Sequence, residues 1–60
     1  MSEAYWEVVW DDWSTEHSEV HFNPEDALSL AQTLAEDVKR CASVKVFDPD
    51  GKIIFHKDNL

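Results

Sequence analysis

The sequence predicts a small α+β domain of order β-β-α-β-β, in which one amphipathic helix packs on one face of a four-stranded antiparallel sheet. Three observations predict this fold class. An amphipathic pattern with a matching start signal occupies the middle of the chain. Runs rich in β-branched and aromatic residues stand on both sides of it, and the last two runs flank Asp48 to Gly51 (DPDG), a strong turn signal. We expect the 60 residues to form a single domain, 1–60.

Two strands are predicted before the helix, at residues 4–11 and 18–22. Side chains alternate along a strand, so each run has two distinct faces. The side chains set toward the helix are Trp6, Val8 and Trp10 from the first strand and Val20 and Phe22 from the second. The connection, residues 12–17, has no glycine and no two-residue turn signature, which favours a looser loop carrying Trp13.

The helix is predicted to begin at Pro24, a position where the missing N–H of proline costs nothing. Asn23 supplies an N-cap side chain, and two acids follow near the positive helix end. Lys39 and Arg40 are expected near the negative end, with Arg40 four residues after Glu36. At 100° per residue, nine apolar residues fall within an arc of about 160°. They are Ala27, Leu28, Leu30, Ala31, Leu34, Ala35, Val38, Cys41 and Ala42.

Residues 43–47 and 52–57 are predicted to form a second hairpin around the DPDG turn. For a type I turn with a glycine bulge, the expected pairs are Asp48 with Lys52, Val46 with Ile54, and Phe47 with Ile53. One side of the hairpin then carries Phe47, Ile53 and Phe55, and the other carries Val44, Val46 and Ile54. The pattern leaves open which of these two sides packs on the helix.

An apolar patch is expected on the sheet face that the helix does not cover, because both hairpins carry apolar residues on both sides. Such a patch on a small protein marks an interaction surface, and a chain of this size gains stability from oligomerisation. The sequence therefore predicts a protein-binding module that forms a homodimer or docks on a protein partner. The alternative is that Trp13, a terminus or a long side chain folds over the patch. The predicted partner-binding residues are Tyr5, Val9, Trp13, Phe47, Ile53 and Phe55.

Charge is divided unevenly along the chain. Residues 1–38 contain ten acids and no Lys or Arg, whereas residues 39–60 contain three acids and five bases, and the net charge is −8. Such a field repels nucleic acid and anionic membranes, so neither is expected as a direct ligand. The predicted acidic surface consists of Glu7, Asp11, Asp12, Glu16 and Glu19.

Three interpretations of this acidity stay open: solubility, a salt-adapted host, and mimicry of nucleic acid. Alternate strand positions recur about every 6.6 Å, which is on the scale of phosphate spacing. Mimicry would make the chain an inhibitor that presents its acidic surface to a basic nucleic-acid-binding protein, and this is the alternative functional hypothesis.

No catalytic, metal or cofactor site is expected. His17 and His21 alternate with Glu19 on a predicted strand, where residues four apart lie about 13 Å apart, too far for one zinc ion. Cys41 falls in the apolar arc of the helix and is expected in the core. The adjacent acid pairs lie at the helix start, at a strand end or on the solvent face, not in a cleft. Gly51 is the only glycine, so there is no glycine-rich phosphate loop.

The sequence favours a cytoplasmic protein. Its single cysteine excludes an intrachain disulfide and agrees with a reducing compartment. The first residues have no basic stretch followed by an apolar core, so a signal peptide is not expected. No apolar run approaches the roughly 20 residues that a membrane span needs.

The order of elements is similar to that of several small bacterial and phage domains. Tyr5 and Trp6 open a strand, residues 25–31 (EDALSLA) open a helix, and Val44 to Val46 begin the next strand. Over about residues 5–48 the chain resembles these domains, which include a phage inhibitor of host RNA polymerase. It departs from them in a further strand after Gly51. The resemblance implies action by binding another protein, and it transfers no functional residue.

Overall fold

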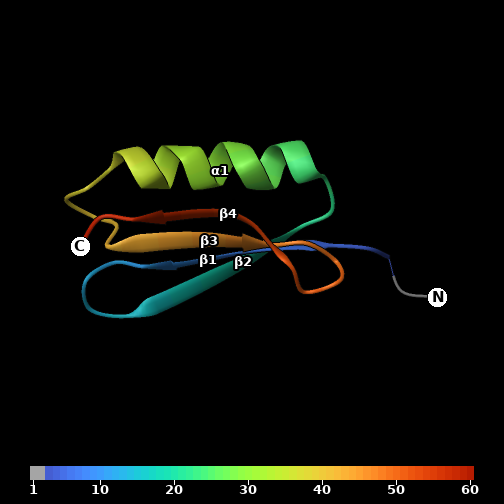
Figure 1. The fold of residues 1–60 in the computed structure, drawn as a ribbon, viewed down its shortest axis with the longest axis horizontal. Coiled ribbons are helices and arrows are strands. Elements are labelled where there is room, and N and C mark those ends of the chain that lie inside the picture. The colour runs from blue at the N-terminus through green and yellow to red at the C-terminus, as the bar shows by residue number, and fades with distance from the viewer. Residues whose placement is uncertain (1–2) are drawn as a thin grey trace.

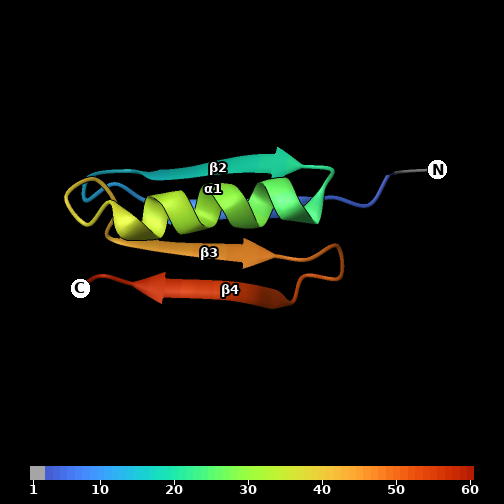
Figure 2. The same cartoon turned by 90° about the horizontal axis from the view of Figure 1, so that it is seen from above.

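The computed structural model describes residues 3–60 and has the predicted β-β-α-β-β order (Figure 1). The elements are β1 (Trp6–Asp11), β2 (Glu16–His21), α1 (Pro24–Glu36), β3 (Ser43–Phe47) and β4 (Ile53–Asp58). The four strands form one antiparallel sheet in the order β2-β1-β3-β4, so β1 and β3 are central. The α+β class and the single helix on one sheet face are therefore confirmed (Figure 2).

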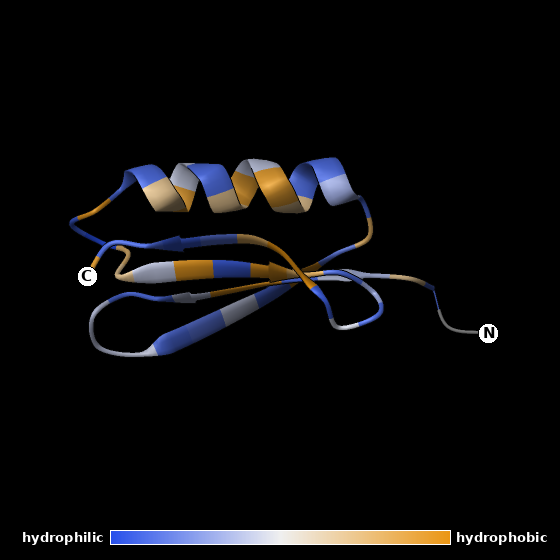
Figure 3. Cartoon of the chain, viewed as in Figure 1, coloured by the Kyte–Doolittle hydropathy of each residue, from blue (hydrophilic) through white to orange (hydrophobic). Residues whose placement is uncertain are grey.

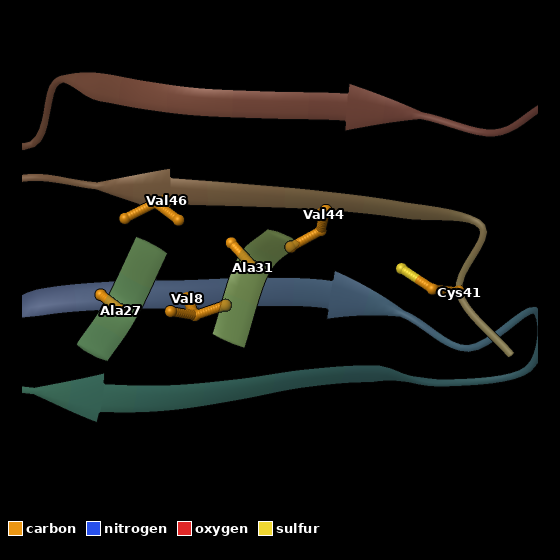
Figure 4. Packing of buried hydrophobic residues seen from close by; sticks show 6 residues of the cluster. All are labelled: Val8, Ala27, Ala31, Cys41, Val44 and Val46. Atoms are coloured by element: carbon orange, nitrogen blue, oxygen red, sulfur yellow. The ribbon is translucent and has the colours of Figure 1, made fainter. Parts of the chain in front are cut away.

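The core lies between α1 and the two central strands. Val8 on β1 pairs with Val46 on β3, and Trp10 pairs with Val44. Paired residues point to the same face of a sheet, so the β1 set Trp6, Val8 and Trp10 faces the helix as predicted. The side of the second hairpin that packs on the helix is the one carrying Val44 and Val46. The fully buried cluster consists of Val8, Ala27, Ala31, Cys41, Val44 and Val46 (Figure 4).

Two alanines allow α1 to lie close to the sheet. Ala27 and Ala31 are one helical turn apart and both are completely buried. Larger residues of the helix, Leu28, Leu30 and Leu34, pack around this contact and stay partly accessible. Hydrophobic and hydrophilic residues alternate along α1 and β3 (Figure 3), which is the pattern of elements that bury only one side.

The start of α1 follows the prediction, but its end does not. Asn23 Oδ1 accepts the Glu25 N–H at 2.8 Å, and Pro24 is the first helical residue. The helix ends at Glu36, so the expectation that residues 38–42 continue its apolar arc is wrong. A helix of 13 residues is about 20 Å long, like a strand of six residues, so another turn would overshoot the sheet.

Residues 37–42 instead form turns that return the chain to β3. The Asp37 carbonyl accepts the N–H groups of both Arg40 and Cys41. Cys41 is buried as expected although it lies outside the helix, whereas Val38 is 52% exposed. The Arg40 Nε lies 4.0 Å from an Asp37 carboxylate oxygen, in place of the expected partner Glu36.

Strand β2 presents the opposite face from the one predicted. Val8 pairs with Glu19, so the odd-numbered residues of β2 point to the helix side and Val20 points away. A shift of one residue in the pairing reverses both faces of a strand. Because β2 is an edge strand, its polar residues on the helix side lie beside the helix and can still reach water. His17 there stacks on Trp10 with ring centroids 5.4 Å apart. Val20 and Phe22 are 47% and 64% exposed.

Besides the predicted turn, the second hairpin contains an irregularity in β4 that the local pattern does not predict. The turn is as predicted, since the Asp48 N–H bonds the Lys52 carbonyl at 2.8 Å and Gly51 has a φ of 86°. The pair Phe47 with Ile53 is confirmed, but Val46 pairs with Phe55 and not with Ile54. The extra residue moves Phe55 to the helix side, where it packs against the core.

Asn59 fastens the end of β4 to the end of α1. Its side-chain Nδ2 donates to the carbonyls of Ala35 and Cys41 at 3.3 and 3.0 Å. Its backbone N–H donates to the Ala42 carbonyl at 2.8 Å. Asn59 thereby provides hydrogen-bond donors for one carbonyl in the last turn of α1 and for two carbonyls in residues 37–42.

Candidate protein-binding face

The sheet face opposite α1 is not covered by any element within residues 3–60 (Figures 1 and 2). We call it the open face. Its members follow from the strand register, because they alternate with the helix-facing residues. They are Tyr5, Glu7, Val9 and Asp11 along β1 and the residue before it, Glu16, Ser18 and Val20 on β2, Ser43, Lys45 and Phe47 on β3, and Ile53, His56 and Asp58 on β4.

One end of the open face is apolar. Glu7 on β1 lies between Val20 and Phe47 in the register, and Phe47 pairs with Ile53. Tyr5 precedes β1 at the same end and is 48% exposed, while Ile53 is 52% exposed. We call Tyr5, Val20, Phe47 and Ile53 the apolar end. Tyr5, Val20 and Ile53 are each about half exposed, and Phe47 is partly buried.

The other end of the open face is acidic. Asp11 pairs with Glu16 on β2 and with Ser43 on β3, and Ser43 pairs with Asp58 on β4. We call Asp11, Glu16 and Asp58 the acidic end. Together with Glu7, it gives the open face four carboxylates against one amine, that of Lys45. The face therefore combines an apolar end with a net negative charge.

Four of the six predicted partner-binding residues lie on the open face, namely Tyr5, Val9, Phe47 and Ile53. Phe55 does not, because the bulge in β4 turns it toward the core. Trp13 lies in the β1–β2 loop, and its Nε1 donates to the Val38 carbonyl at 3.1 Å. This contact fastens the loop to the turn after α1, so Trp13 does not fold over the open face.

The predicted acidic surface is divided between different parts of the fold. Glu7, Asp11 and Glu16 share the open face. Glu19 points to the helix side of β2, where a carboxylate oxygen lies 3.7 Å from His21 Nε2. Asp12 lies in the β1–β2 loop. Val20 also belongs to the open face, which the sequence pattern does not predict because it depends on the β2 register.

A shallow hollow opens beside the apolar end, with a volume of about 180 Å³. It is lined by Tyr5, Glu7, Phe47, Asp48, Pro49 and Gly51. Sites for small-molecule substrates usually measure about 300 to 1,000 Å³. The hollow is smaller than this range and is close in size to a single amino-acid side chain.

Asp12 organises the β1–β2 loop through its carboxylate. Oδ1 accepts the N–H groups of Thr15 at 2.8 Å and Ser14 at 3.0 Å, and Oδ2 lies 2.7 Å from His17 Nε2. The Thr15 N–H, the His17 ring and the Ser14 N–H together hold the pKa of the Asp12 carboxyl well below its ordinary range. The hydrogen bonds to the Asp12 carboxylate therefore hold together a loop that contains no glycine.

Replacing Asp12 by Asn is expected to flatten the acid limb of the stability curve. Because folding lowers the pKa of Asp12, its carboxylate stabilises the fold above the ordinary carboxyl pKa of about 4, and this stabilisation is lost progressively as the pH falls below that value. Urea denaturation of both proteins between pH 6 and pH 2 measures the difference. Asp50→Asn, in the other turn, is the control, and an unchanged acid limb in Asp12→Asn would contradict the assignment.

Cys41 is a core residue. Burial, the larger effect, raises the pKa of its thiol, and Sγ donates to the Ser43 carbonyl at 3.3 Å. Within residues 3–60, no three His, Cys, Asp or Glu side chains are grouped so that they could hold a metal ion. In the same part of the chain, no helix has the length and hydropathy to cross a bilayer.

Comparison with known proteins finds no matching family model, curated protein or solved structure.

Proposed function

We propose that this chain is a non-catalytic protein-binding module whose open face docks on a basic protein. The observation that carries the proposal is the apolar end, where Tyr5, Val20 and Ile53 are each about half exposed on a sheet face without a covering layer. Exposed apolar groups interspersed with polar ones, as Val20 and Phe47 are with Glu7 between them, are typical of protein interfaces. Burial of the apolar end would supply the affinity, and the surrounding charges would select the partner.

The charges on the open face favour a basic partner over a second copy of the chain. Four carboxylates face outward with one lysine, and the whole chain has a net charge of −8. Two such faces would repel each other, whereas a basic surface would be attracted and steered into place. A homodimer is the alternative arrangement, in which two copies would overlap at their apolar ends with their acidic ends apart.

A nucleic-acid-binding protein is one class of partner that this face suits. Glu7 and Asp11 point to the same side of β1, and Glu16 lies beside Asp11. Acidic groups displayed in this way could occupy a surface that normally holds phosphates. In that case the module would act as an inhibitor, in agreement with the second functional hypothesis.

Site-directed photo-crosslinking tests the proposal. A benzoylphenylalanine at Val20, on the open face, is expected to capture a basic protein in a lysate of the host cell. The matched control is Gln32, an exposed position on α1. The captured protein, once purified, is expected to bind the module with an affinity that falls at least tenfold between 50 and 200 mM salt, because charged contacts are screened.

Three results would contradict the proposal. Equal capture from Val20 and Gln32 would show no preference for the open face. A crosslink only to a second copy, with a dimer in light scattering, would establish self-association instead. Salt-insensitive binding of the purified protein would show that the acidic residues do not select the partner.

A further inference from the structure

The geometry points to the hollow beside the apolar end as a socket for one arginine side chain of the docked partner. This inference rests on the proposed function and names the residue type that the open face recognises. The hollow combines two aromatic residues with a carboxylate, and its volume of about 180 Å³ suits a single side chain.

The aromatic part of the socket comes from Tyr5 and Phe47, with Pro49 at the turn. Tyr5 is about half exposed, and Phe47 is partly buried on β3. Aromatic rings attract cations, and a guanidinium also stacks on them because it is planar and weakly hydrated. These groups therefore favour a cationic and flat occupant.

The charged part of the socket comes from Glu7. Within residues 3–60 its carboxylate makes no hydrogen bond or ion pair, so both oxygens are available to a ligand. Its direct neighbours across the sheet, Val20 and Phe47, are apolar and do not compete for it. Asp48 adds negative charge at the rim, although its Oδ1 already accepts the N–H groups of Asp50 and Lys52.

Arginine fits this set of groups better than lysine. A guanidinium can donate two parallel hydrogen bonds to one carboxylate while its face lies against a ring. A lysine ammonium is a strongly hydrated point charge and loses more on entering a partly apolar hollow. Val20 and Ile53, the apolar residues on either side of the socket, would contact the partner residues that lie next to the arginine.

Titration of the isotope-labelled protein with N-acetylarginine methylamide, followed by NMR, tests the socket. Saturable shifts with a millimolar Kd are expected at the amides of Glu7, Phe47 and Gly51. The lysine analogue is expected to bind at least threefold more weakly. The citrulline analogue, which has nearly the same shape without the charge, is expected to bind at least tenfold more weakly.

Two variants that each remove one negative charge show which carboxylate binds the arginine analogue. Glu7→Gln is expected to weaken binding of the arginine analogue at least fivefold, whereas Glu16→Gln, at the acidic end of the same face, changes it less than twofold. Tyr5→Leu keeps an apolar side chain without the ring and is expected to weaken binding about threefold. The amide spectrum of each variant shows whether it is folded.

Equal binding of the arginine and citrulline analogues, or equal losses in Glu7→Gln and Glu16→Gln, would overturn the socket. The crosslinking experiment separates this failure from that of the proposed function. Capture from Val20 that is unaffected by Glu7→Gln would retain the protein-binding module and reject the arginine socket. Loss of capture in Glu7→Gln but not in Glu16→Gln would support both.

Discussion

Val8→Asp is expected to unfold the domain, whereas Val9→Asp, one residue further along β1, leaves it folded. Val8 is completely buried between α1 and the sheet, where it pairs with Val46. An unpaired carboxylate there costs several kcal/mol, which approaches the whole stability of a domain of this size. Far-UV circular dichroism and urea denaturation measure the effect.

The matched variant tests the assignment of the two sheet faces. Val9 lies on the open face between Ser18 and Lys45, so a carboxylate at this position reaches water. The expected loss is about 1 kcal/mol or less, from lower β-propensity and the nearby acids. A folded Val8→Asp protein, or an unfolded Val9→Asp protein, would show that the faces of β1 are reversed.

Ala31→Leu is expected to lower the free energy of unfolding by about 1 to 3 kcal/mol, because three added carbon atoms do not fit between α1 and the sheet. Ala31 has no exposed surface and belongs to the same buried cluster as Val8 and Val44 (Figure 4). For a domain this small, each kcal/mol corresponds to a fall in Tm of about 4 to 8 °C. Thermal and urea denaturation give both quantities.

Gln32→Leu is the control for this overpacking, since it introduces the same side chain at the next residue of α1. Gln32 is exposed, and leucine is at least as good a helix former as glutamine. Its unfolding free energy is expected to stay within about 0.5 kcal/mol of the wild type. Similar losses in Ala31→Leu and Gln32→Leu would indicate that the close helix–sheet contact is not what limits residue size at position 31.

The parts of the fold that sequence predicts well are those specified by neighbouring residues. Asn23 and Pro24 define the helix start through a side-chain cap and a fixed φ. Asp48 to Gly51 define the second turn, where glycine takes the positive φ that the turn requires. Both features involve contacts over at most four residues, so the local pattern contains the information.

The parts that sequence did not predict depend on distant contacts. The end of α1 follows from the length of the sheet, and the face of β2 follows from its pairing with β1. The Asn59 side chain donates hydrogen bonds to the carbonyls of Ala35 and Cys41, which lie 24 and 18 residues away in the sequence. No local sequence pattern predicts such a contact. These features appear only once the elements are packed together.

The same distinction explains the candidate site. Tyr5 and Val9 are predicted on the open face because β1 is a regular strand whose alternation is simple to follow. In β3 the alternation separates Phe47 from Val46 but does not show which of the two meets the helix. The bulge in β4 reversed Phe55. Val20 is predicted on the helix side of the sheet, but its pairing with Glu7 places it on the open face, in the apolar end.

The bulge in β4 also has a consequence for aggregation. An apolar strand at a sheet edge, such as the Ile53 to Phe55 segment, is a template on which further copies can add by backbone pairing into a fibre. The extra residue interrupts the regular row of N–H and C=O groups, and Lys57 places a charge further along the same strand. The bulge therefore makes the edge of the sheet less able to pair with further copies while the open face stays exposed.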